Sequence, residues 1–445
     1  MHSKLIQQYG VAVLGAGPIG LAAAAQLRAR GIRPTIFEAG ETVGQSFREV
    51  AHVQLFSPWR YNMDGSARAL LEQKGWQAPE LEALPTAGEL LRDYLSPLGA
   101  ALAADLQLNS RVLAVSRLNM DKIKSGEREQ TPFLIRVQRA GEIKTFLAGA
   151  VIDATGTWAQ PNPLGANGLP AVGEVDLAAR IFYGIPDVAG RHRPRYAGKT
   201  VLVVGAGHSA AGALLGLADL AATAPRTQLH WATRGDNLRR VLGGGDADQL
   251  PARGALGQRL QQLMTSQRLR LHSSFRIQSI EAAPDGLRVL ADTPEGAAEL
   301  RGIDEIICAT GSRPDLALTR ELRVRLDAWL ESAEVLAPLI DPNLHSCGTV
   351  RPHGHRELTH PEPGFYIVGA KSYGRAPNFL MATGYEQVRS IAAALAGDME
   401  AADAVQLVLP ETGVCSARPV VGTGSACCVK DAQARSVGKA GCGCS

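Results

Sequence analysis

The chain has 445 residues, of which 45% are hydrophobic and 20% are charged, so we expect two or three globular domains and exclude a chain that is disordered as a whole. Its 46 basic and 43 acidic residues give a formal charge of +3, which provides no electrostatic footprint for nucleic acid. No apolar run approaches the ~18 residues that a membrane span needs, and residues 1–9 lack the apolar core of a signal peptide, so we expect a cytoplasmic protein.

A βαβ unit is predicted at the start of the chain. A strand at Val11–Leu14 precedes an Ala- and Leu-rich helix that ends near Gly31, and a second apolar run closes at Glu38. The turn before the helix follows the Gly-x-Gly-x-x-Gly pattern, with these residues: Gly15, Gly17, Pro18 and Gly20. Such a turn lets the backbone approach a pyrophosphate at the helix N-terminus, and the acid that ends the next strand accepts hydrogen bonds from a ribose. The unit predicts a dinucleotide site with Glu38 on the ribose.

Three short strands are predicted next, and a second βαβ unit follows them. The three strands are Phe133–Val137, Thr145–Leu147 and Val151–Asp153, with a turn at Gly141 between the first two. The second unit has a strand at Val201–Val204, a helix through about residue 222 and a strand at Gln228–Thr233. Its phosphate-binding turn contains Gly205, Gly207, His208, Ser209 and Ala210.

The second unit closes on Arg234, where the first closes on an acid. An arginine at this place suits a 2′-phosphate, so NADPH is preferred over NADH, although a solvated basic loop containing Arg239 and Arg240 is an alternative interpretation. We interpret His208 as a packing or capping residue in preference to a catalyst.

Further elements are predicted toward the C-terminus. They are a helix at Leu256–Thr265, strands at Leu269–Leu271, Phe275–Ile280, Leu287–Leu290 and Phe365–Val368, and a helix from near Pro377 to near Gly397. From about Pro410 onward the composition is that of a flexible tail.

The two units and the segments around them resemble two-dinucleotide-binding-domain flavoproteins. The resemblance rests on DATG at 153–156, on CATGSRP at 308–314 and on two C-terminal segments at 364–370 and 384–387, and it covers residues 9–398. It implies an α/β fold with two Rossmann-like domains of the glutathione-reductase type, the NADPH domain being inserted into the FAD domain. We therefore expect an FAD domain at 1–165 and 336–405, an NADPH domain at 166–335 and a Cys-rich tail at 406–445. Further cofactor contacts implied by the resemblance are Thr155, Gly156, Gly311, Gly369 and Gly384.

The flavin-side loop separates branches of this superfamily. Residues 41–65 and 201–300 contain no cysteine, which disfavours a conventional disulfide reductase. Instead, GQSFR at 44–48 and LFSPW at 55–59 resemble the flavin-contacting loop of flavin-containing and N-hydroxylating monooxygenases, which implies that Gln45 and Ser46 contact FAD. This resemblance implies an enzyme that uses molecular oxygen and a flavin hydroperoxide to oxygenate a soft nucleophile: nitrogen, sulfur or a metalloid such as trivalent arsenic.

Candidate pocket residues come from the flavin-side loop and from the start of the C-terminal helix, and no catalytic acid or base is identified. The candidates are Gln45, His52, Trp59, Tyr61, Asn378 and Phe379, and core or structural roles compete for Trp59, Tyr61 and His52. A metal site at His345, Cys347, His353, His355 and His360 is disfavoured because their spacing matches no recognised ligand pattern.

Five of the seven cysteines lie in the tail: Cys415, Cys427, Cys428, Cys442 and Cys444. Thiolates favour soft ions, and the arrangement resembles the cysteine tails of mercuric reductase and of some thioredoxin reductases. Two alternatives to the monooxygenase therefore stay open, an NADPH-dependent metal, metalloid or thiol reductase and a non-catalytic thiol metal-binding flavoprotein. In a further interpretation, the tail thiols have no function of their own. The sequence also leaves open whether the protein forms a homodimer.

Overall fold

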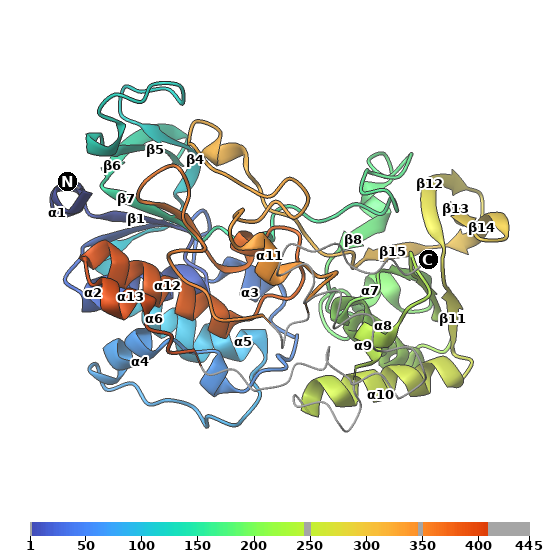
Figure 1. The fold of residues 1–445 in the computed structure, drawn as a ribbon. Helices are drawn as coiled ribbons and strands as arrows, with labels where there is room; N and C mark the ends of the chain where they lie inside the picture. The colour runs from blue at the N-terminus through green and yellow to red at the C-terminus, as the bar shows by residue number, and fades with distance from the viewer. Residues whose placement is uncertain (1, 244–250, 346–349, 408–445) are drawn as a thin grey trace, which may run out of the picture.

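The computed structural model describes residues 2–243, 251–345 and 350–407, which form two lobes lying side by side (Figure 1). Each lobe contains a five-stranded parallel sheet and a three-stranded antiparallel sheet. None of the described helices has the length and apolar character to cross a membrane. The predicted α/β architecture with two Rossmann-type units is confirmed.

The parallel sheet of the first lobe joins segments from both ends of the chain. Its order is β16 (Phe365–Ile367), β7 (Ala150–Asp153), β1 (Val11–Leu14), β2 (Pro34–Phe37) and β3 (Leu106–Gln107). Helices α2 (Pro18–Ala29) and α12 (Met381–Ala396) pack on each other, and most of their residues are buried. Because β16 pairs with β7, the segment after the second lobe completes the first (Figure 1).

The parallel sheet of the second lobe repeats the same plan. Its order is β11 (Leu269–His272), β10 (Gln228–Ala232), β9 (Thr200–Val204), β15 (Glu305–Cys308) and β8 (Ile181–Tyr183). Helix α8 (His208–Thr223) connects β9 to β10, and α10 (Pro251–Thr265) packs against α8. The carboxyl ends of β9 and β10 therefore meet at the N-terminus of α8, where a doubly wound sheet places its ligand.

The antiparallel sheets and short helices complete the two lobes. The sheets contain β4 (Arg111–Arg117), β5 (Phe133–Arg139) and β6 (Glu142–Ala148) in the first lobe, and β12 (Arg276–Ala283), β13 (Gly286–Thr293) and β14 (Gly296–Ile303) in the second. The remaining α-helices are α1 (His2–Tyr9), α3 (Gln45–Glu49), α4 (Gly65–Glu72), α5 (Ala87–Leu90), α6 (Ser96–Ala101), α7 (Arg193–Tyr196), α9 (Arg239–Leu242), α11 (Ala337–Ile340) and α13 (Met399–Asp403).

The structure differs from the sequence-based expectations in two elements, and the second of them borders the site. Strand β14 is formed by a segment without a strand pattern, and it is held by its pairing with β13. Helix α12 begins at Met381 and not near Pro377, because Leu380 has an extended backbone with φ −121° and ψ 144°. Asn378 Nδ2 donates a hydrogen bond to the Ile340 carbonyl oxygen, which holds this segment outside the helix. The predicted turn at Gly141 is confirmed, since this residue has φ +83° between β5 and β6.

A buried ion cluster holds the antiparallel sheet of the first lobe to the segment before β16. The fully buried carboxylate of Glu362 lies 2.8 Å from Arg117 Nε and 2.7 Å from Arg128 Nη2. The guanidinium of Arg117 also lies 3.6 Å from the ring centroid of Phe133. Burial raises the pKa of Glu362, but the two arginines and the Arg323 N–H outweigh it and hold that pKa below its ordinary value.

Candidate functional site: two dinucleotide cradles and the cavity between them

The first glycine turn leaves an open cradle at the N-terminus of α2. Gly15 has φ +94°, and a Cβ there would lie 2.8 Å from the Ala154 carbonyl oxygen. A Cβ at Gly20 would collide with the Gly15 carbonyl oxygen, so the helix can approach the strand only with glycine. A Cβ at Gly17 would meet no atom within 4 Å, although this residue has ordinary extended angles. Gly17 therefore borders space that a pyrophosphate can fill, and Pro18 starts the helix beside it.

Glu38 lies beside this cradle. Its carboxylate accepts hydrogen bonds from the Ala16 N–H at 2.7 Å and from the Gly40 N–H at 2.8 Å. These two contacts orient the carboxylate at the carboxyl end of β2. Gln45 begins α3 nearby, since its Cβ lies 3.1 Å from the position of a Cβ at Gly40, and Ser46 follows it in the same helix.

The two crossover and closing segments border the same cradle. Gly156 has φ +69° with no atom within 4 Å of a Cβ, so it also faces open space. Gly369, with φ +68°, and Gly384 both pack on Ile19 of α2, at 3.2 Å and 2.6 Å from the position of a Cβ. Glycine is therefore needed at 369 and 384 to seat η8 (Gly369–Tyr373) and α12 against the first helix.

Lys371 was not among the predicted residues, yet it lies at the centre of this region. Its Nζ lies 2.7 Å from Asp153 Oδ2 and 2.9 Å from Thr155 Oγ1, and the Thr155 hydroxyl donates to Asp153 Oδ1 at 2.6 Å. A lysine directly after an apolar strand and its glycine is the signal in the sequence that indicates this role.

The second glycine turn forms a matching cradle at the N-terminus of α8. Gly205 has φ +130°, and a Cβ there would collide with the Ala309 carbonyl oxygen, while a Cβ at Gly207 would meet nothing within 4 Å. Ala210 is fully buried against the core of the second lobe. Arg234 is exposed just after β10, with Nη1 3.3 Å from the Ala166 carbonyl oxygen. Gly311, with φ +88°, lies beside Asn162.

A cavity of about 840 Å³ lies between the two lobes. Residues 52–57 on the flavin side and 185–189 of the linker line it together with parts of α8 and α10. Four residues around the start of α12 also line it: Pro377, Phe379, Leu380 and Met381. The α8 and α10 residues are His208, Ser209, Gly212, Leu215, Gly216 and Asp219, and Ala252, Arg253, Ala255, Leu256 and Arg259. The cavity therefore connects the loop predicted to touch flavin with the N-terminus of the second cradle.

An aromatic contact joins the lobes at this cavity, which is also lined by two titratable side chains, His52 and Asp187. The ring of Phe56 packs edge-on against His208, with centroids 5.3 Å apart and planes at 63°. Partial burial lowers the pKa of His52, which keeps its imidazole uncharged near neutral pH. The Asp187 carboxylate accepts hydrogen bonds from the Gly190 N–H at 2.8 Å and from the Arg191 N–H at 3.2 Å.

Only some of the candidate pocket residues line the cavity. His52 and Phe379 do, whereas Trp59 belongs to the core of the first lobe, with 4% of its surface exposed. Asn378 is buried and donates a hydrogen bond to the Ile340 carbonyl oxygen, and the ring of Tyr61 lies under the guanidinium of Arg60. Phe56 and the two glycines inside α8 were missed by the sequence analysis, although glycine inside a helix costs about 1 kcal/mol relative to alanine and is a signal in itself.

The disfavoured histidine cluster is not assembled. Each of the four histidines has a different hydrogen-bond partner. A ring nitrogen of His353 is hydrogen-bonded to Gln387 and one of His355 to Asp403, while His345 and His360 are hydrogen-bonded to two different backbone carbonyl oxygens. In the part of the chain that the structure describes, no group of three or more His, Cys, Asp or Glu is placed to hold a metal ion. Cys347 and the tail residues Cys415, Cys427, Cys428, Cys442 and Cys444 lie outside the described residues.

Cys308 ends β15 and is buried. Its Sγ lies 3.2 Å from Thr310 Oγ1 and 3.5 Å from the Asn162 carbonyl oxygen. Burial raises its pKa to about 12, so this thiol is protonated at neutral pH and is not a nucleophile. Among the described cavity-lining residues there is no cysteine.

Comparisons with solved structures give the same fold at low sequence identity. A bacillithiol disulfide reductase from Bacillus cereus aligns with a TM-score of 0.65 and 17% identity over 87% of this chain and 99% of that one. The FAD-bound cadaverine monooxygenase of desferrioxamine biosynthesis from Erwinia amylovora aligns with a TM-score of 0.61 and 14% identity, over 91% of this chain and 99% of that one. An ornithine N-hydroxylase from Kutzneria sp. 744, with reduced FAD, NADP+ and L-ornithine, aligns with a TM-score of 0.57 and 16% identity, over 88% of this chain and 98% of that one.

A family comparison is more specific. No curated protein matches the sequence significantly. The family model described as pyridine nucleotide-disulphide oxidoreductase matches residues 12–346, which include both glycine turns and both crossover segments. The chain therefore belongs to the pyridine nucleotide-disulphide oxidoreductase family.

Proposed function

We propose that this flavin-dependent oxidoreductase is a monooxygenase that uses FAD and NADPH to oxygenate a soft nucleophile. The observation that carries the proposal is the cavity between the two cradles, whose described lining holds no thiol that could accept electrons. Under this proposal, the electrons pass to a diffusible oxidant and a small substrate at the place where the two dinucleotides would meet. Molecular oxygen is that oxidant, and trivalent arsenic, sulfur and nitrogen centres are nucleophiles of the required kind.

The residues of the first cradle fit FAD. Open space at Gly17 and Gly156 would accommodate a pyrophosphate, and the Glu38 carboxylate, oriented by the Ala16 N–H, would accept hydrogen bonds from a ribose. Gln45, Ser46 and Thr155 belong to the segments that would border the isoalloxazine. FAD, when bound, supplies hydride acceptance and reaction with oxygen, while the protein orients it and limits access of water.

The residues of the second cradle fit NADPH. The N-terminus of α8, with Gly207 leaving space in front of it, favours a pyrophosphate. The exposed guanidinium of Arg234 at the end of β10 would bind the 2′-phosphate. His208 and Ser209 would lie between the pyrophosphate and the cavity, because they begin α8 and also line the cavity.

The structural neighbours support two branches of this reaction class. The Erwinia cadaverine monooxygenase and the Kutzneria ornithine N-hydroxylase support the proposal. The bacillithiol disulfide reductase favours the alternative, an NADPH-dependent reductase of a thiol, metal or metalloid that uses the tail cysteines. Among the described residues, neither buried Cys308 nor the cavity lining offers a thiolate for such a reductase, so this alternative depends on the tail cysteines.

The two candidates differ in what happens to oxygen. Under the proposal, purified holoenzyme mixed with NADPH, a soft nucleophile and isotopically heavy O2 yields product that contains one heavy oxygen atom. A chain truncated after Pro410 gives the same product, because the tail is not required for a diffusible substrate. Oxygen-independent, substrate-dependent NADPH consumption that the truncation abolishes would refute the monooxygenase and establish the reductase.

A further inference from the structure

The inter-domain cavity continues well beyond the flavin-side loop. On α8, the lining positions 208, 212, 215, 216 and 219 lie on one face of the helix, and on α10 the positions 252, 255, 256 and 259 face them. Val188 and Ala189 of the linker close the space from a third side. We call this region the α8–α10 part of the cavity.

Part of the wall of this region is apolar, and the wall has a recess. Leu215, Leu256 and Val188 supply aliphatic side chains. Gly212 has ordinary helical angles, and a Cβ there would meet no atom within 4 Å, so its missing side chain leaves space open to the cavity. A Cβ at Gly216 would lie 2.9 Å from Val188 Cγ2, so the linker already fills the space there. Gly212 is therefore the position at which a larger side chain would reduce the space for a ligand.

The charge of the cavity opposes a cationic ligand. Its described lining contains three arginines, Arg240, Arg253 and Arg259, and two aspartates. Asp187 already accepts two backbone N–H groups, and Asp219 Oδ2 lies 3.3 Å from Arg259 Nη2. The described side chains of the lining therefore carry one more positive than negative charge, which favours a neutral ligand over a cationic one.

We infer that the substrate is a soft nucleophile without positive charge, whose apolar body of aryl or branched alkyl size lies beside Gly212 in the α8–α10 part of the cavity. The inference rests on the proposed function and gives its substrate class. In the balanced reaction, NADPH and one proton supply two electrons and two hydrogens. One oxygen atom of O2 forms a bond to the lone pair of the nucleophile, the O–O bond breaks, and the other oxygen atom leaves as water.

The test uses three probes on the full-length holoenzyme: methyl phenyl sulfide, dimethyl sulfide and cadaverine. Sulfoxide formation is expected from both sulfides, and no hydroxylamine is expected from cadaverine. In Gly212→Leu, the KM for methyl phenyl sulfide should rise by about tenfold, a size typical of changing a hydrophobic pocket, while that for dimethyl sulfide stays within about twofold. Ala222→Leu is the matched control, because this residue is exposed on the same helix and does not line the cavity.

Binding is measured separately, from the perturbation of the flavin spectrum when methyl phenyl sulfide is added to the oxidised holoenzyme. A perturbation that Gly212→Leu weakens and Ala222→Leu preserves supports the apolar site whatever the turnover. If the sulfide binds in this way but no heavy oxygen enters the product, the proposed function fails and the site stands. Efficient hydroxylation of cadaverine, or equal effects of the two substitutions, would overturn the inference.

Discussion

Lys371 and Asp153 form an ion pair inside the first lobe, with Nζ 2.7 Å from Oδ2 and neither side chain exposed. Lys371 belongs to η8, directly after β16, while Asp153 ends β7 beside β1. The pair therefore connects the segment that closes the first lobe to the crossover that carries Thr155 and Gly156. This contact places the ammonium group of Lys371, which belongs to the C-terminal part of the chain, next to the proposed FAD cradle.

Removal of the cation should destabilise the fold. Lys371→Met leaves the Asp153 carboxylate buried without its partner, and we expect the free energy of unfolding to fall by about 3–5 kcal/mol. Urea denaturation of the FAD-free protein measures this value. The double variant Lys371→Met, Asp153→Asn removes the uncompensated charge and should recover part of the loss. Equal stability of wild type and the single variant would show that the pair does not hold the two segments together.

Substitution of Gly17 should impair flavin binding without impairing folding. Gly17→Val is expected to leave the unfolding free energy of the FAD-free protein within about 0.5 kcal/mol, because the backbone angles suit any residue and no atom lies within 4 Å of the new Cβ. The side chain would nevertheless occupy the proposed pyrophosphate position, so the flavin-to-protein absorbance ratio should drop. Gly20→Val is the contrasting variant, since its side chain collides with the Gly15 carbonyl oxygen and should destabilise the protein itself. Full flavin retention in Gly17→Val would place FAD elsewhere.

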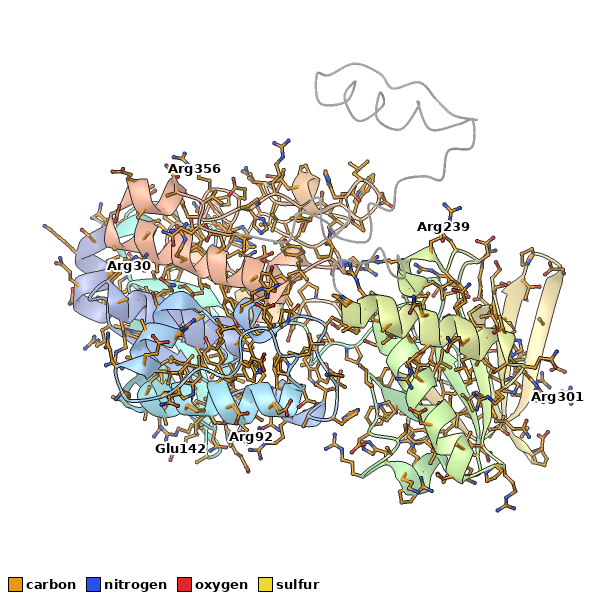
Figure 2. The ribbon with its side chains drawn as sticks, turned by 90° about the horizontal axis from the view of Figure 1, so that it is seen from below. Arg30, Arg92, Glu142, Arg239, Arg301 and Arg356 are labelled. Atoms are coloured by element: carbon orange, nitrogen blue, oxygen red, sulfur yellow. The ribbon has the colours of Figure 1, made fainter. Side chains whose placement is uncertain are left out.

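Arg234 should distinguish the two nicotinamide cofactors. In Arg234→Ala, the KM for NADPH should rise by about tenfold, which corresponds to about 1.4 kcal/mol for a lost charge-assisted contact, while the KM for NADH changes little. Flavin reduction rates at varied cofactor concentration give both constants. Arg301→Ala is the control, because Arg301 is an exposed arginine at the outer end of the same lobe (Figure 2) and its guanidinium pairs with Glu299 of β14. Equal effects on both cofactors would refute the 2′-phosphate assignment.

His360 should make stability depend on pH. Burial lowers the pKa of this imidazole from 6.5 to about 4, so the unfolded chain takes up a proton at a higher pH than the folded protein does. The contribution of the uncharged His360 to the free energy of unfolding is therefore fully present above pH 6.5. It is lost at up to about 1.4 kcal/mol per pH unit as the pH falls toward 4. His360→Phe keeps a ring beside Phe365 without the titrating group, so its unfolding free energy should fall less between about pH 7 and about pH 5. Parallel pH profiles of the two proteins would contradict this assignment.

Local chemistry explains how much was predictable from the sequence. Both glycine turns, the helices that follow them and the polar residue that ends each second strand depend on backbone angles and on hydrophobic periodicity over about 30 residues. Gly15, Gly20 and Gly205 are needed because a Cβ at each would collide with or crowd a neighbouring carbonyl oxygen. The sequence by itself therefore determined the two dinucleotide units and their place in the chain.

The tertiary structure decided which distant residues meet. Phe56 and His208 are 152 positions apart, yet their rings are in contact, because the two lobes pack across the cavity. The late start of α12, the pairing of β14 and the ion pair of Lys371 likewise depend on contacts with remote segments. No local periodicity encodes such contacts, since they arise from how complete elements pack. The shape, the charge and the thiol-free lining of the cavity between the lobes follow only from that packing.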